Sequence, residues 1–220
     1  MIPSTGMIQK TALTLATVGV LAAALTASAS QARLEASPVR PADAWLKKTA
    51  NARYHQLFDF PTAGGGIPLV HIMNYVDTYN KAYGVPDKDI NPVGTFYGAT
   101  TFFGVSDAMW AKYKIGEFLN EKDGTGQAFT RNPWREAPVI LGMELRAASI
   151  ETLQQRGSTF ILCNNALTIF SGMLAKALGL EATNVYNDLK ANILPGVELI
   201  PGMVVAIEQA QSAGLSYHRQ

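Results

Sequence analysis

The most informative segment of the sequence is Ser158-Thr-Phe-Ile-Leu-Cys-Asn-Asn-Ala-Leu167. Residues 159–163 form a short apolar run, which is typical of a buried strand. Asn164 or Asn165 is a good N-cap for the helix that should follow, and Gly179 is a plausible stop for that helix. The stretch therefore predicts a strand that runs directly into a helix.

Strands and helices alternate on both sides of this junction. The predicted strands cover 54–60, 91–97, 139–143, 159–163, 196–200 and 215–218. The predicted helices cover 68–83, 105–119, 149–156, 165–178, 184–193 and 203–213. Such alternation predicts an α/β fold, with a mostly parallel sheet of about five strands and helices on both of its faces.

Composition excludes several classes of function. The chain has 220 residues, of which 48% are hydrophobic and 16% charged. Lys10 is the only charged residue before position 33, so the remainder carries 18 − 1 = 17 basic against 17 acidic residues. This balance argues against a nucleic-acid partner and against binding to an anionic membrane surface. One cysteine and three scattered histidines predict no disulfide within the chain, no metal and no cofactor.

Residues 1–32 have the pattern of a secretory signal peptide. Lys10 precedes an apolar run over 11–25, and small residues offer cleavage after Ala29 or Ala32. The run is shorter than the roughly 20 residues that span a bilayer, although an uncleaved anchor is the alternative. We therefore expect a periplasmic or secreted product that has no membrane span after cleavage.

The mature chain divides into a leader arm and one domain. Residues 33–50 form the arm, which contains two prolines and a short predicted helix over 42–49. Residues 51–220 form a single α/β domain. The polar stretch 120–137 interrupts this domain, and we expect it to be a long surface loop.

Cys163 is the candidate functional residue. Ligands bind at the carboxyl ends of the strands in open α/β sheets, and Cys163 ends a predicted strand. Backbone N–H groups at the start of the next helix favour a thiolate, which lowers a thiol pKa below its free value of about 8.5. The alternative is that Cys163 completes a row of core side chains.

Several segments resemble the DsrE-like family of sulfur-relay proteins. The resemblance runs through Phe160-Ile-Leu-Cys-Asn-Asn-Ala166, Gly196-Val-Glu-Leu-Ile-Pro-Gly202 and the end of the chain from Ile207 to His218. The first half is similar in layout, with a strand over 54–60, a helix through Asn74–Tyr79 and a strand into Tyr97-Gly98-Ala99.

This resemblance implies a DsrE-like fold with flavodoxin-like layering and a persulfide on Cys163. It also implies a sulfur donor or acceptor thiol as partner and a homo-oligomer, either a trimer or a hexamer. The predicted export and the loop at 120–137 depart from the family's cytoplasmic relays.

Five further residues are candidates for ligand contact. Asn164 and Asn165 could donate to a bound anion, although both also suit a capping role. Gly98, Thr100 and Thr101 follow a predicted strand and should share the rim with Cys163. The alternative for these three is an ordinary strand-to-helix turn.

The sequence therefore leaves two functions open. One is an exported carrier of sulfane sulfur that works through Cys163, with at most a sulfurtransferase-like activity. The other is a non-catalytic oligomeric module that binds a small ligand or a partner and keeps Cys163 in its core.

Overall fold

A computed structural model of the protein describes residues 43–220. The predicted signal peptide, and the leader arm up to residue 42, lie outside these residues. The short helix expected at the end of the arm is present as α2 (Ala44–Ala50).

Five parallel strands form one sheet in the order β6-β5-β2-β1-β7, which confirms the predicted α/β fold. The strands are β1 (Tyr54–Asp59), β2 (Ile90–Phe96), β5 (Thr159–Cys163), β6 (Val197–Ile200) and β7 (Ser216–Arg219). All residues of β2 and β5 are buried, as expected for the inner strands of a parallel sheet that is covered on both faces.

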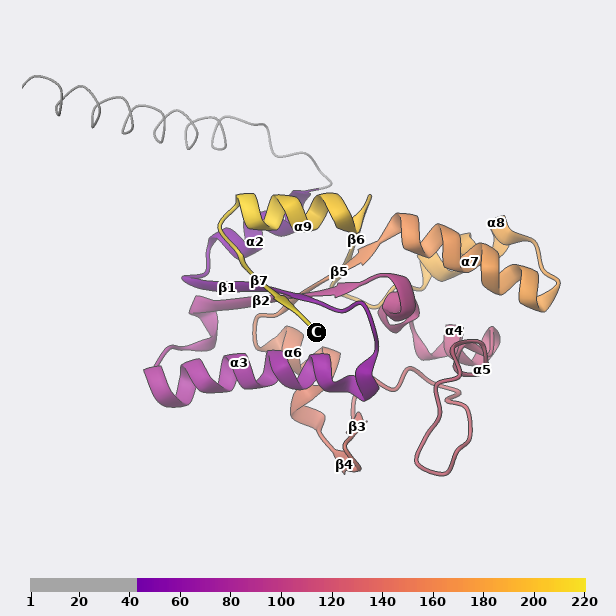
Figure 1. Cartoon of the computed structure of the whole chain (residues 1–220), viewed down its shortest axis with the longest axis horizontal. Helices are drawn as coiled ribbons and strands as arrows, with labels where there is room; N and C mark the ends of the chain where they lie inside the picture. The colour runs from indigo at the N-terminus through magenta and orange to yellow at the C-terminus, as the bar shows by residue number, and fades with distance from the viewer. Residues whose placement is uncertain (1–42) are drawn as a thin grey trace, which may run out of the picture. The chain divides into compact units, whose positions relative to one another are not determined.

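Helices cover both faces of the sheet. On one face lie α3 (Ile67–Tyr83) and α6 (Ile150–Gln155), and on the other lie α2 and α9 (Met203–Ser212) (Figure 1). Side chains alternate along β5 in the same way. Phe160 and Leu162 belong to the core under α3, whereas Ile161 and Cys163 belong to the core under α9.

The chain changes faces between β5 and β6. After β5 it enters α7 (Asn164–Leu178) and α8 (Ala182–Ala191), whose apolar residues join the core under α3. After β6 it enters α9 on the opposite face. In open α/β sheets, a crevice forms where neighbouring strands lead to opposite faces. The end of β5 therefore lies at such a crevice.

Two predicted elements differ from the structure. The helix expected over 105–119 is split into α4 (Asp107–Lys112) and α5 (Ile115–Leu119), because Lys114 has a left-handed φ of 50°. The strand expected over 139–143 is a separate hairpin of β3 (Val139–Ile140) and β4 (Met143–Glu144). Its two-residue turn has positive φ at Leu141 and Gly142, a turn that favours hairpins.

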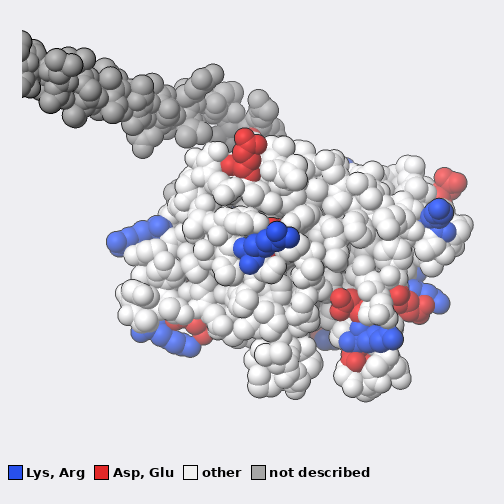
Figure 2. All heavy atoms as spheres, viewed as in Figure 1, with Lys and Arg blue, Asp and Glu red and all other residues white. Residues whose placement is uncertain are grey.

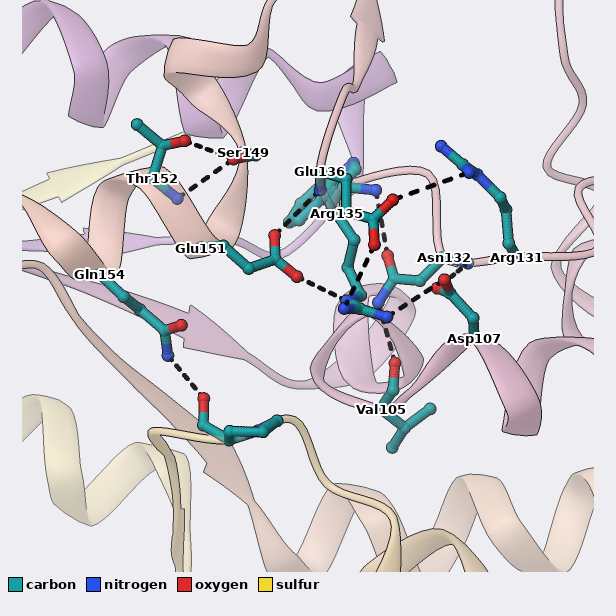
Figure 3. A network of polar contacts seen from close by, with 12 residues as sticks. Val105, Asp107, Arg131, Asn132, Arg135, Glu136, Ser149, Glu151, Thr152 and Gln154 are labelled. Carbon is teal, nitrogen blue, oxygen red and sulfur yellow. Dashed lines mark hydrogen bonds and ion pairs between the residues drawn. The ribbon is translucent and has the colours of Figure 1, made fainter.

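The stretch 120–137 is not a surface loop throughout. Asn132 and Trp134 are buried, and the Asn132 side chain donates to the carbonyls of Phe103 (2.7 Å) and Val105 (2.9 Å). Arg135 then bonds Glu151 and pairs with Asp107 (Figure 3). A polar composition predicted exposure, but Asn132 has buried backbone partners and Arg135 has two half-buried carboxylate partners.

We expect Asn132→Ala to destabilise the fold. The substitution leaves two buried carbonyls without their donor and removes the acceptor of the Trp134 N–H, so the free energy of unfolding should fall by about 2–4 kcal/mol. Urea unfolding measures this change. Asn187→Ala, at an exposed position of α8, is the control and should stay within about 0.5 kcal/mol of the wild type. Equal stability of the two variants would contradict the anchoring role.

Candidate functional site

Cys163 is the last residue of β5 and the N-cap of α7. Its backbone is still extended, and its sulfur accepts the N–H of Ala166 at 3.4 Å. The predicted capping by Asn164 or Asn165 is therefore wrong. The helix begins one residue earlier than expected, so both asparagines lie inside its first turn.

A second backbone group reaches the same sulfur. The N–H of Met203, the first residue of α9, donates to Cys163 Sγ at 3.3 Å. The two N–H groups come from the N-termini of two helices, one of 15 and one of 10 residues. Helix N-termini carry partial positive charge, so both favour negative charge on the sulfur.

The remaining surroundings of Cys163 are apolar. The residue is 5% exposed and belongs to a buried cluster with Trp45, Ile161, Ile200 and Met203. The sulfur is therefore nearly closed off from solvent, with helix-end N–H groups as its polar contacts.

A pocket of about 300 Å³ lies beside this cluster, between α2 and α9. It is lined by Asp43, Trp45, Asn165, Ile200, Pro201, Gly202, Val205, Ala206 and Gln209. Cys163 is absent from this lining, but Trp45, Ile200 and Ala206 belong both to the lining and to the cluster around the sulfur. The indole N–H of Trp45 is buried and has no hydrogen-bond partner among residues 43–220.

The two asparagines after Cys163 point to different places. Asn164 Oδ1 accepts from the hydroxyl of Tyr186 in α8 at 2.7 Å, so this side chain is held away from the pocket. Asn165 is exposed and lines the pocket. A Cβ at Gly202 would lie 3.3 Å from Asn165 Nδ2, so glycine at this position leaves the amide its space.

Gly98, Thr100 and Thr101 form the turn after β2, within the 3₁₀ helix η4 (Gly98–Gly104). Both threonines are fully buried. Thr100 Oγ1 lies 2.8 Å from the carbonyl of Phe60, and Thr101 Oγ1 donates to the carbonyl of Gly98 at 2.8 Å. These hydroxyls hold the turn, so we do not include the three residues in the site proposed below.

The structure also has a buried carboxylate at the same end of the sheet, which was not among the candidate residues predicted from the sequence. Asp59 ends β1, is 3% exposed and accepts from the hydroxyl of Tyr217 at 2.6 Å. This hydrogen bond is the largest cause of the raised pKa of Tyr217. The pKa of Tyr97 is also raised, with burial as the largest cause and a hydrogen bond to Asp59 as the second. Both phenols therefore stay protonated donors. An aspartate that ends an apolar strand was the signal available in the sequence.

Three other kinds of functional feature could occur among the described residues: a metal site, a membrane-spanning helix and a basic patch. Among residues 43–220, no three histidine, cysteine, aspartate or glutamate side chains gather as a metal site would require. Within the same residues, every helix is too short or too polar to cross a bilayer. Acidic and basic side chains are mixed on the face shown in Figure 2, with no basic patch there.

Comparisons with known proteins add little. No family model matches the chain, and no curated protein matches it. One similar solved structure is the protein of unknown function MTH1491 from Methanobacterium thermoautotrophicum, with 16% sequence identity and a TM-score of 0.35. The match covers 76% of this chain and 99% of that one. The resemblance to the DsrE-like family thus gains no support from them and stays a prediction.

Two variants of Cys163 separate a hydrogen-bonding sulfur from one that merely fills the core. If the sulfur caps α7, Cys163→Ser keeps an acceptor, whereas Cys163→Ala leaves two buried N–H groups unpaired. We expect the alanine variant to be less stable than the serine variant by about 1 kcal/mol. Urea unfolding of both variants measures the difference. An alanine variant as stable as the serine variant, or more so, indicates a sulfur that acts as a small hydrophobic group.

Proposed function

We propose that this chain carries sulfane sulfur on Cys163. The observation that supports this function best is the convergence of the Ala166 and Met203 N–H groups on one sulfur atom beside a pocket. A thiolate is the nucleophile in thiol–disulfide and persulfide chemistry. A site that favours negative charge on sulfur suits both the loading and the release of a sulfur atom.

The chemistry needs no external oxidant. After the thiol proton is lost to solvent, the thiolate attacks the outer sulfur of thiosulfate. A new S–S bond forms to Cys163, and the bond to the sulfite group breaks, so that sulfite leaves with the electron pair. In the second step, an acceptor thiolate takes the outer sulfur and the electron pair returns to Cys163 Sγ. The chain has no other cysteine, so the acceptor thiol comes from another molecule.

The N-termini of α7 and α9 stabilise the site most when the negative charge is on Cys163 Sγ. In the persulfide, the negative charge moves to the outer sulfur, and it returns to Sγ as the acceptor attacks. Preorganised N–H donors aimed at the atom where charge develops lower the barrier of such a step. Asn165, which lines the adjoining pocket, is a further donor there.

One observation favours the second candidate, a ligand-binding module that is not catalytic. Cys163 is only 5% exposed, and Trp45 of α2 packs in the same cluster. A donor reaches the sulfur only when α2 or a neighbouring side chain shifts. If this movement does not occur, Cys163 is structural and the function lies elsewhere on the surface.

The cellular setting and assembly of the carrier are part of the proposal. Residues 1–32 have the pattern of an export signal, which supports a carrier that works in the periplasm or outside the cell. The expected trimer or hexamer rests on the resemblance to the DsrE-like family alone.

Intact-mass spectrometry tests the carrier directly. Incubation of residues 33–220 with thiosulfate or sodium tetrasulfide should add one sulfur, a gain of about 32 Da, that dithiothreitol removes. Cys163→Ser should gain nothing under the same conditions. A folded wild-type protein whose mass does not change would rule out the carrier and leave the binding module.

The adjacent asparagines supply a matched pair of variants for the loading rate. Asn165→Ala removes a donor from the pocket, so loading of Cys163 from thiosulfate should slow by about tenfold. Asn164→Ala removes only the contact with Tyr186 and should load at the wild-type rate. Equal rates in the two variants would show that the pocket is not the route to the sulfur.

A further inference from the structure

A second concave site lies on the face of the sheet opposite to Cys163. It is an open groove of about 650 Å³ between α3 and the edge of the sheet formed by β1 and β7. Its lining consists of Tyr54, Gln56, Phe58, His71, Asn74, Tyr75, Thr78, Tyr79, Tyr83 and His218, which we call the tyrosine groove.

The amphipathic pattern of α3 builds one wall of the tyrosine groove. Leu69, Ile72 and Val76 are fully buried and point into the core. Residues at the neighbouring helical positions, including His71 and Thr78, line the groove instead. In Figure 1, α3 runs below the sheet and β7 passes at its near edge, beside β1. The alternate residues of β1 from Tyr54 to Phe58 form the floor.

Contacts between aromatic rings fix the shape of the groove. The ring centroid of Tyr79 lies 4.3 Å from that of Tyr54 and 5.0 Å from that of Tyr75. Tyr75 in turn packs edge-on against Phe58 at 5.4 Å. These separations are typical of favourable aromatic pairs. The rings support one another, so the wall is preformed rather than assembled around a ligand.

Three polar side chains that line the groove, those of Gln56, Asn74 and Thr78, make no hydrogen bond within residues 43–220. At the end near β7, His71 Nδ1 bonds the side-chain amide oxygen of Gln220. The Nε2 of that Gln220 amide is buried and unpartnered among the described residues. Donors and acceptors are therefore available along an aromatic surface.

The groove contains no lysine, arginine, aspartate or glutamate. Burial is the largest cause that raises the pKa of Tyr75, and the neighbouring Tyr79 raises it further, so this phenol stays neutral. A phosphate, a carboxylate or a nucleic-acid strand would find no lysine or arginine in the lining. This chemistry favours an uncharged occupant.

We propose that the tyrosine groove binds a neutral, planar heteroaromatic ring system. Ring faces stack on tyrosine and phenylalanine, while ring nitrogens and carbonyls pair with Gln56, Asn74 or Thr78. A volume of about 650 Å³ is within the range of sites for molecules of this size. The inference is independent of Cys163, because no residue of the tyrosine groove lines the pocket beside Cys163 or belongs to the cluster around its sulfur.

The concave shape of the groove favours this ligand over a second copy of the chain. A contact between copies buries a broad surface, whereas a small molecule is enclosed by a cleft. A heteroaromatic ligand brings both ring faces and hydrogen-bonding atoms into the concave space.

Riboflavin is a suitable probe, because its ring system is neutral and its fluorescence is quenched on stacking. Wild-type protein should quench riboflavin in a saturable titration, and Cys163→Ser should do so with the same dissociation constant. Thr78→Arg places a long cationic side chain in the groove and should weaken binding by about tenfold or more. Thr183→Arg, at an exposed position of α8, is the matched control and should bind like the wild type.

Three results would overturn the proposal. The first is no saturable quenching by the wild-type protein, and the second is quenching that Thr78→Arg does not weaken. The third is binding of the saccharide maltose, measured by calorimetry, in place of riboflavin. Sedimentation velocity adds a separate readout. If the wild type self-associates, Thr78→Arg dissociates it and riboflavin has no effect, the groove is an interface between copies and the proposal is wrong.

Discussion

Two backbone N–H groups that meet on one sulfur atom are the contact on which this account of the protein depends. Ala166 contributes the N–H from the first turn of α7, and Met203 contributes the N–H from the first residue of α9. Cys163 thereby ties the end of β5 to the starts of two helices. A buried N–H without an acceptor costs free energy, so the sulfur satisfies groups that the topology leaves unpaired.

The topology explains why these two helices begin so close together. β5 and β6 are neighbours in the sheet, but their helices go to opposite faces, so both helix N-termini start at one crevice. On the other face, α3 covers β1 only in part and leaves the tyrosine groove along β7. The same sheet thus holds a buried, hydrogen-bonded cysteine at the carboxyl end of its strands and an aromatic groove at its edge.

Most of the fold could be predicted from the sequence, because apolar periodicity and glycine stops are local signals. β5 was predicted with its observed bounds, and Gly179 ends α7 as expected. The site was harder, because its contacts join residues far apart in the chain. The N–H of Met203 comes to Cys163 across 40 positions, and Tyr217 comes to Asp59 across 158. The sequence predicted that Cys163 ends a strand just before a helix. It did not predict that Cys163 caps this helix, because sulfur is an uncommon capping atom.

The most direct test of this account follows the amide resonances of Ala166 and Met203 in a ¹⁵N-labelled sample during treatment with sodium tetrasulfide. The account predicts that both resonances shift together as Cys163 is loaded and return to their starting positions when dithiothreitol removes the added sulfur. If both resonances stay unchanged while the rest of the spectrum remains that of a folded protein, the sulfur neither reacts nor depends on these two donors, and the central claim fails.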